Sequence, residues 1–148
     1  MSTNLKSIIT AQISAVYKNN LDLGTPTDTF LKKVLIELSN GTSANSADLL
    51  FHNQRTLAAS GTEDLDLAGS LTNPLDGSTM TYVELKFLLI YAASGNTNNV
   101  VLSRPASNGV PLFSAASDAI PIYPGGVFLW ANPGDGGVTV TASTLPAE

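Results

Sequence analysis

The sequence predicts an all-β protein, an antiparallel β-sandwich of jelly-roll-like type with one short helix in its N-terminal third. Three observations predict this class. Short runs rich in Val, Ile, Leu, Tyr, Phe and Thr recur along the chain, and Gly, Pro, Asn, Asp or Ser bounds each of them. After Gly41 no segment of helical periodicity separates successive runs, which argues against a parallel sheet with crossover helices. The segment from Ile9 to Tyr17 alternates with a period of two.

The first two elements are read from their periodicity. Ile9, Ala11, Ile13, Ala15 and Tyr17 fall on one side of a half-buried strand, and a turn follows at NNLDLGTP. The next run, TDTFLKKVLIELSNG, carries apolar residues at helical spacing, which are Phe30, Leu31, Val34, Leu35 and Leu38. Asp28 would cap this short helix and Gly41 would end it. A strand that uses Phe30, Val34, Ile36 and Leu38 is the alternative.

The rest of the chain supplies the remaining strands of one domain, residues 1–148, with residues 1–7 as a flexible N-terminal arm. The runs are ADLLFHNQRTLA, EDLDLAG, TYVELKFLLIYAA, NNVVLSRP, DAIPIYPGGVFLWAN and GVTVTAS. In the third, Glu84 and Lys86 alternate with apolar residues, and the end, Leu88 to Tyr91, is expected to be buried on both faces. Pro121 places its run at a sheet edge or bend. The expected structural turns lie at Gly41, Gly69, Gly125 and Gly126.

Composition limits the partners. Charged residues are 13% and hydrophobic residues 43% of the chain, and the net charge is −5. A surface so poor in charge lacks the repulsion that keeps monomers apart, so we expect other copies or other proteins to cover much of it. With 7 Lys and Arg and no basic cluster, no nucleic-acid partner is expected. The absence of cysteine and of any long apolar run predicts a soluble protein folded in a reducing cytoplasm, with no membrane partner.

Three carboxylates stand close together in ASGTEDLDLAG. Because Leu65 and Leu67 alternate with Asp64 and Asp66, the leucines are expected to face the core and the carboxylates to face solvent or a neighbour. A calcium loop starting at Asp64 would have Ala68 and Leu75 where oxygen ligands belong. Irregular surface calcium and a glycosidase carboxylate pair, with Glu63 nearby, remain as alternatives.

The other chemically suggestive residues also favour structural roles. His52 is the only histidine and cannot build a zinc site alone, and no G-x-S-x-G segment supports a Ser-His-Asp triad. Arg55 is expected to pair with a carboxylate. Tyr123, Phe128 and Trp130 form the candidate interface, with Trp130 in the core or an interface and carbohydrate stacking as the alternative. We therefore expect no catalytic residue, no cofactor and no metal site.

Several segments together resemble a known group of proteins. They are Asn20–Gly24, Asn40–Asp48, Arg55–Ala59, Asp64–Gly69, Val83–Ile90 with Asn96–Val101, and Pro124–Val127. In this order they are similar to small virion structural proteins of tailed bacteriophages. The motifs are structural signatures without a catalytic residue. Members of that group often continue past the VT segment with a further strand pair, so a neighbouring copy could be needed to complete the last sheet.

The resemblance implies a capsid decoration, or cement, protein. Such a protein binds the outer capsid lattice, with the major capsid protein and further copies of itself, as a trimer or dimer, for partners. After synthesis in the host cytoplasm it would reside on the capsid surface of the virion. The competing hypotheses are a tail, fibre or head-fibre protein that binds a host glycan or receptor, and a small hydrolase that uses the carboxylates.

Overall fold

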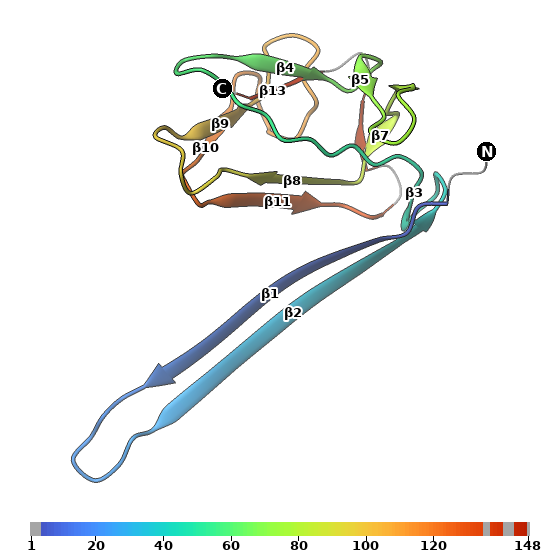
Figure 1. Cartoon of the computed structure of the whole chain (residues 1–148). Coiled ribbons are helices and arrows are strands. Elements are labelled where there is room, and N and C mark those ends of the chain that lie inside the picture. The colour runs from blue at the N-terminus through green and yellow to red at the C-terminus, as the bar shows by residue number, and fades with distance from the viewer. Residues whose placement is uncertain (1–3, 135–136, 141–143, 148) are drawn as a thin grey trace.

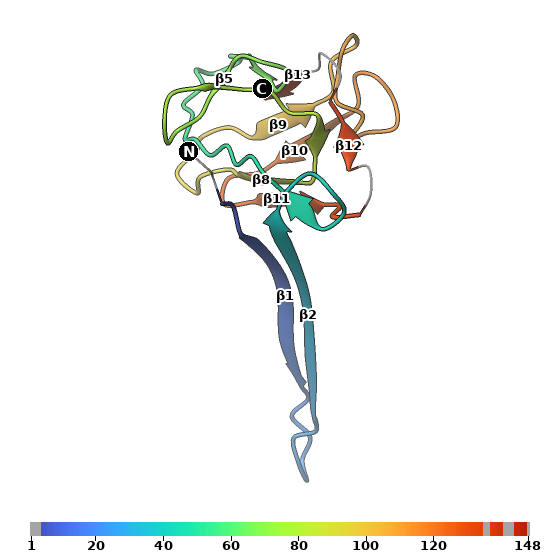
Figure 2. The same cartoon turned by 90° about the vertical axis from the view of Figure 1, so that its right-hand side faces the viewer.

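A long two-stranded hairpin projects from a β-rich head (Figures 1 and 2). The computed structural model describes residues 4–134, 137–140 and 144–147. We call residues 7–40 the hairpin and the described residues from 46 onward the head. Every regular element in the described residues is a strand. The all-β prediction is therefore confirmed.

The hairpin consists of β1 (Ser7–Lys18) and β2 (Thr27–Asn40). They pair antiparallel without interruption, from Ser7 opposite Leu38 to Lys18 opposite Thr27. Twelve residues at about 3.3 Å each make β1 about 40 Å long. In the connecting turn the Leu21 amide donates to the Gly24 carbonyl at 2.9 Å. The strand predicted from Ile9 and the turn predicted after it are confirmed. The half-burial expected of this strand is wrong, because Ile13 and Tyr17 of the face predicted to be buried are 64% and 74% exposed.

The predicted helix at Thr27–Gly41 is wrong, because these residues form β2. The alternative strand is the one found, with Phe30, Val34, Ile36 and Leu38 on one face. The helix-like spacing arose because Leu31 and Leu35 add apolar side chains to the opposite face. Asp28 caps nothing, and Gly41 follows the end of a strand. Pairing with β1 satisfies the backbone of the whole segment, which outweighs a local helical pattern.

The head contains ten described strands in addition to β3 (Ser46–Ala47), which pairs in parallel with Ser39 and Asn40 at the base of the hairpin. They are β4 (Glu63–Asp66), β5 (Leu71–Thr72), β6 (Thr79–Met80), β7 (Glu84–Leu85), β8 (Phe87–Tyr91), β9 (Val100–Ser103), β10 (Ala119–Ile122), β11 (Val127–Ala131), β12 (Val138–Thr139) and β13 (Thr144–Ala147). One sheet has the order β10-β9-β13-β4, and β11-β8, β12-β7 and β5-β6 form separate pairs. All these pairings are antiparallel.

Two hydrophobic clusters fill the head. The first is built on Leu67, Leu71, Met80, Leu85, Val110 and Val140. The second is built on Ala92, Leu102 and Ile122. Leu88 packs against both clusters, so the inward face of β8 links them. Among the described residues neither cluster takes a side chain from the hairpin.

Several strand predictions need correction. The run Ala47–Ala58 has no ladder beyond Ala47 and crosses the head as extended chain (Figure 1). The end of TYVELKFLLIYAA is not buried on both faces, because Leu89 and Tyr91 are exposed in this chain. The segment is also divided, since Lys86 separates β7 from β8. The run GVTVTAS yields β12 at Val138–Thr139, and residues 141–143 lie outside the described residues.

The turns and ends of the chain position these strands. Gly125 has a φ of 80° in the turn between β10 and β11, where a Cβ atom would be strained. Gly126 adjoins it in the same turn, and Gly41 and Gly69 also have positive φ. β10, with Pro121, is an edge strand as predicted. β13 lies between β9 and β4, so the C-terminal segment itself supplies an inner strand of the largest sheet of the head.

The N-terminal residues are described from Asn4 onward, and residues 1–3 of the expected N-terminal arm lie outside the described residues. The Leu5 amide donates to Oδ1 of Asn40 at 3.0 Å, and Ser7 already belongs to β1. The element that projects from the head is thus the hairpin, which the sequence pattern did not predict to stand alone.

Candidate functional site

The acidic cluster of the sequence serves the fold. Leu67 is 6% exposed and Leu65 packs against the first cluster, so both leucines face inward as predicted. Asp66 accepts a hydrogen bond from the Ala68 amide at 2.9 Å and thereby fixes the turn after β4. Glu63 forms an ion pair with Arg55, which confirms the carboxylate partner expected for that arginine.

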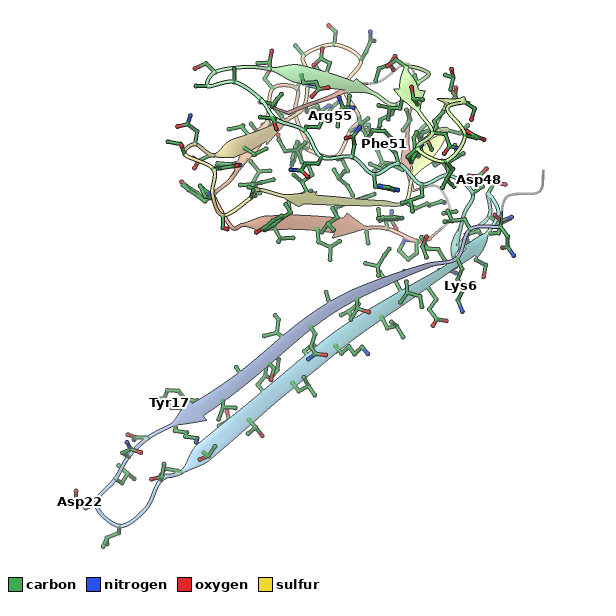
Figure 3. All side chains as sticks on the ribbon, viewed as in Figure 1. Lys6, Tyr17, Asp22, Asp48, Phe51 and Arg55 are labelled. Carbon is green, nitrogen blue, oxygen red and sulfur yellow. The ribbon has the colours of Figure 1, made fainter. Side chains whose placement is uncertain are left out.

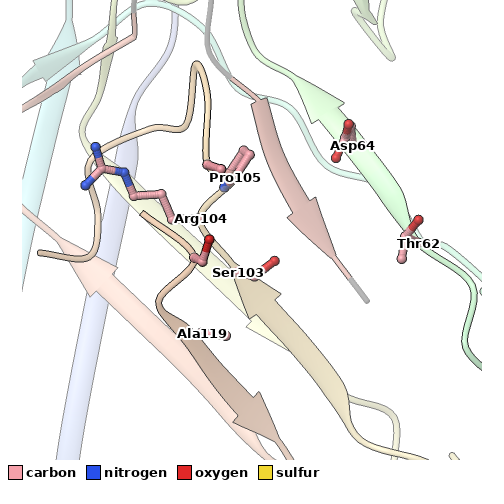
Figure 4. A pocket seen from close by; sticks show the side chains of 8 residues that line it. Thr62, Asp64, Ser103, Arg104, Pro105 and Ala119 are labelled. Carbon is pink, nitrogen blue, oxygen red and sulfur yellow. The ribbon is translucent and has the colours of Figure 1, made fainter. Parts of the chain in front are cut away.

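Asp64 is the remaining carboxylate and lines a shallow depression of about 390 Å³ (Figure 4). The other lining residues are Thr62, Ser103, Arg104, Pro105, Ala106, Ser117 and Ala119. Nη1 of Arg104 donates to the carbonyl of Phe113 at 2.8 Å, and no ion pair joins Arg104 to Asp64 in the described part of the chain. No second carboxyl and no histidine lines the depression, so its described walls offer Asp64 no acid-base partner.

The remaining candidates for chemistry are dispersed. His52 is exposed on the extended segment Leu49–Ala58, outside any ladder. Among the described residues, no three His, Asp or Glu side chains gather closely enough to hold a metal ion. Of the catalytic candidates named from the sequence, Asp64 alone lines the depression described above.

The candidate interface residues are also separated. Tyr123 is exposed beside the β10–β11 turn. Phe128 packs against the second cluster, where its ring centroid lies 6.4 Å from that of Phe113. Trp130 packs against the first cluster. Of the three aromatic side chains, only Tyr123 presents its ring to solvent.

The exposed apolar surface of the head lies on the opposite side of the same strands. The residues of β8 and β11 that alternate with the inward-facing ones are Phe87, Leu89, Tyr91, Val127, Leu129 and Ala131. We call this surface the head face. It contains no charged residue. The period of two in VFLWA is the sequence signal for this surface.

The hairpin carries a second and longer apolar surface. On one side, which we call the apolar face, β1 contributes Ser7, Ile9, Ala11, Ile13, Ala15 and Tyr17, and β2 contributes Asp28, Phe30, Lys32, Val34, Ile36 and Leu38. Ile13, Tyr17 and Phe30 are 64%, 74% and 53% exposed. The side chains are apolar or aromatic except for Ser7, Asp28 and Lys32. Figure 3 shows side chains standing on both sides of the projecting ribbon, with Tyr17 toward its tip.

The opposite side, the mixed face, is more polar. Its residues are Ile8, Thr10, Gln12, Ser14, Val16 and Lys18 from β1, and Thr27, Thr29, Leu31, Lys33, Leu35 and Glu37 from β2. The ribbon is therefore amphipathic, although neither face is covered along most of its length.

A groove joins the apolar face of the hairpin to the head face. It has a volume of about 220 Å³, and Ile9, Ala11, Val34, Ile36, Leu129 and Ala131 line it. The hairpin thus leaves the head with its apolar face turned toward β11. The two surfaces form the walls of one apolar wedge that opens away from the base of the hairpin.

Comparisons with known proteins do not extend this description. No family model, no curated protein and no solved structure matches the chain. The described residues also hold no helix of the length and apolarity needed to cross a lipid bilayer.

Proposed function

We propose that this protein is a structural component of a bacteriophage virion, a capsid decoration or cement protein that binds the outer capsid lattice as an oligomer. The observation that carries the proposal is the hairpin, whose apolar face lies open over nearly its whole length. The resemblance of Arg55–Ala59, Asp64–Gly69 and Pro124–Val127 to virion structural proteins supplies the setting. The partners are the major capsid protein and further copies of this chain.

The physical support is that a two-stranded hairpin with an exposed apolar face is unfavourable in water unless another protein surface covers it. An isolated two-stranded hairpin is marginally stable in water, and an exposed apolar strip of this size marks a protein contact. Within the described residues, both outer edges of the ribbon also lack a strand partner, except where β3 pairs with the base of β2. A projecting element of this kind is suited to assembly, because it gains its cover from a neighbour.

Decoration stabilises a capsid through binding to the assembled state. A ligand that binds assembled capsomers and not free ones shifts the equilibrium toward the capsid by mass action. An oligomer attached at more than one point multiplies a modest affinity at each point. In this proposal the head and the mixed face of the hairpin are available to the lattice, and the protein performs no catalysis.

The proposal includes a finer assignment of the fold. We propose that the head is a β-sandwich of jelly-roll-like type, with the β10-β9-β13-β4 sheet as one layer and the β8–β11 pair in the facing layer. Support comes from the second cluster, where Ile90 and Phe128 of the β8–β11 pair pack with Leu102 and Ile122 of the larger sheet.

The glycan-binding alternative draws less support. Carbohydrate recognition by stacking needs an exposed aromatic ring. Trp130 and Phe128 pack into the head, and Tyr123 alone remains exposed of the three candidates. A tail or fibre role would need a different recognition surface.

The test compares virions with and without this protein. Virions assembled without it are expected to release DNA at a lower temperature than complete ones, and purified full-length chain added back is expected to restore the release temperature. Release is measured with a DNA-binding dye during heating. A different protein of the same capsid, added in equal amount, is the control. Equal release temperatures for the two kinds of particle, or failure of the added chain to sediment with particles, would contradict the proposal.

A further inference from the structure

The occupant of the apolar wedge follows from its shape and charge. We propose that a second copy of this chain fills it, in a two-fold symmetric dimer whose hairpins pack antiparallel, apolar face against apolar face. The inference rests on the proposed function for its setting, and it gives the oligomer of that function a number, a symmetry and named contacts.

Symmetry limits how two such faces can meet. A two-fold axis that brings one face against itself lies in the plane between the copies, either along the hairpin or across it. An axis along the hairpin gives parallel hairpins with β1 over β2. Lys32 lies level with Ile13, so each Lys32 would then pack on the partner's Ile13, far from any carboxylate of the strip. An axis across the hairpin gives antiparallel hairpins with β2 over β2.

Charge selects the antiparallel arrangement and its register. Asp28 and Lys32 are the only charged residues of the apolar face, and they lie symmetrically about Phe30 on β2. Neither forms an ion pair within the described part of the chain. With the axis at Phe30, Asp28 of each copy meets Lys32 of the partner. Both charges of an otherwise apolar strip are then paired, and the pairing occurs twice.

The same register places apolar residues opposite one another on β1. Ala15 is paired with Phe30 in the hairpin and therefore also lies at the axis. Two residues to either side, Tyr17 of one copy packs on Ile13 of the other. All three of Tyr17, Ile13 and Phe30 are more than half exposed in a single chain. The most exposed large apolar side chains of the apolar face are thus covered by the partner.

The tip of the hairpin then reaches the partner's groove. Ile36 lies six residues from Phe30 toward the base of the hairpin, and Gly24 lies six residues from Phe30 toward its tip. The two-fold axis at Phe30 therefore places the turn of one copy over the base of the other. Leu21 and Leu23 stand on this turn, and Leu23 is fully exposed. The groove at the base is apolar and measures about 220 Å³, whereas an apolar cavity of about 150 Å³ already holds a benzene molecule. The tip leucines therefore have an apolar site in the partner.

The size of this contact suits a stable dimer. A strip of two strands, about 40 Å long and about 10 Å wide, covers on the order of 400 Å² in projection on each copy. Two copies together remove about 800 Å², and the two tip-to-groove contacts raise the total past the roughly 1,000 Å² expected of a biological interface.

The first experiment measures the mass of the full-length chain by sedimentation equilibrium, from about 1 to 100 μM and without virus particles. A dimer is expected. Phe30→Asp, which sets two carboxylates against each other at the axis, is expected to give monomers, and Lys32→Glu is expected to weaken the dimer at least about fivefold. The double change Asp28→Lys with Lys32→Glu is expected to restore it. The thermal transition of Trp130 fluorescence shows that each variant folds.

Matched controls lie one residue away on the mixed face. Leu31→Asp and Lys33→Glu make the same chemical changes and are expected to leave the dimer intact. A wild-type monomer at 100 μM overturns the proposal, and so do equal effects of the paired changes on the two faces.

A second experiment tests the direction of the hairpins. The chain has no cysteine, so a spin label on Asp22→Cys reports one position per copy, at the tip of the hairpin (Figure 3). Antiparallel packing about Phe30 separates the two labels by about 45 Å, whereas parallel packing brings them within about 20 Å. Double electron–electron resonance distinguishes the two, and the short distance overturns the proposed arrangement.

The failures of the two proposals are distinguishable. A dimer in solution that does not sediment with virus particles contradicts the proposed function and leaves the dimer standing. A monomer that coats particles, with the hairpin protected from hydrogen exchange only there, overturns the dimer and leaves the decoration role standing.

Discussion

Tyr82 is a tyrosine whose surroundings in the head oppose its ionisation. Its side chain packs against the first hydrophobic cluster. Burial raises the pKa of Tyr82 to about 12, and the negative charge of Asp48 acts in the same direction, while the Phe51 backbone opposes it. The neutral hydroxyl is therefore favoured by the folded state.

This shift gives a pH dependence with a definite sign. Below pH 10 the tyrosine is protonated in both states, and stability does not depend on it. Between pH 10 and 12 the unfolded chain loses the proton first, so the free energy of unfolding is expected to fall, by about 1 kcal/mol after allowance for solvent screening. Urea unfolding at pH 9 and 11 measures the loss. Tyr82→Phe is expected to reduce it, whereas Tyr123→Phe, at an exposed position, is expected to leave it unchanged.

The burial of Lys86 could not be predicted from the identity of the residue. It is 8% exposed, its Nζ lies 2.6 Å from Oε2 of Glu84, and it donates to the carbonyl of Gly134 at 3.1 Å. In the sequence, the alternation of Glu84 and Lys86 with Val83, Leu85 and Phe87 predicts one continuous strand whose charged side chains face solvent. The carbonyl that accepts from Lys86 belongs to Gly134, 48 residues away, which a local pattern cannot register.

Among the elements, the hairpin is expected to be dispensable for the stability of the head. Neither described cluster takes a side chain from it. Replacing residues 10–35 with Asn-Gly joins Ile9 to Ile36, which already face each other across the ribbon, through a turn suited to two-residue hairpins.

This shortened chain is expected to keep the head folded and to lose self-association. The midpoint of its thermal transition should lie within a few degrees of that of the monomeric Phe30→Asp chain, followed by Trp130 fluorescence. A collapse of the transition would show that the hairpin supports the cores, contrary to the packing described above.

The hairpin also shows how far an element can be predicted from its sequence. Alternation from Ile9 to Tyr17 was enough to predict β1, because one face is apolar and, between Ile9 and Tyr17, the other is polar apart from Val16. In β2 the additional residues Leu31 and Leu35 favour a helix on spacing alone and leave a strand as the alternative. Only the partner strand decided between them. For the segment Leu49–Ala58 a strand was predicted and none is found, because its apolar residues pack against the head without pairing to another strand.

At the candidate site, the sequence predicted correctly which side chains of a strand face the core where apolar and charged residues alternate. Leu65 and Leu67 were correctly expected to face inward, and Arg55 to pair with a carboxylate. Phe128 and Trp130 of β11 belong to the candidate interface named from the sequence, with the core as the other place expected for Trp130, and both side chains pack against the clusters of the head. Which of the two alternating sets is covered depends on neighbouring elements, so the exposed set at Val127 and Leu129 could not be identified from the run alone.

At the scale of the whole molecule, low charge and open apolar faces belong together. A chain with 13% charged residues and a net charge of −5 has few charges available to oppose association. Most of the exposed large apolar residues in the described part of the chain lie on the hairpin and the head face. Association is thereby directed to defined surfaces.

A dimer of this kind is expected to make thermal stability depend on concentration. Because the partner binds the folded chain only, a hundredfold increase in protein concentration should raise the unfolding midpoint by about 2–4 °C. Differential scanning calorimetry at two concentrations measures the rise. The shortened hairpin variant should show none, and a rise of the same size in that variant would place the association elsewhere.

The place of β13 in the largest sheet of the head has a consequence for biosynthesis. β4 and β9 are joined through a strand that the ribosome makes after every other described one, whereas the hairpin is made before the whole head. While the head is being translated, the nascent chain therefore exposes the apolar hairpin next to a sheet that still lacks β13. Neighbouring ribosomes on one message would present two such ribbons together, and sibling chains could pair before either is released.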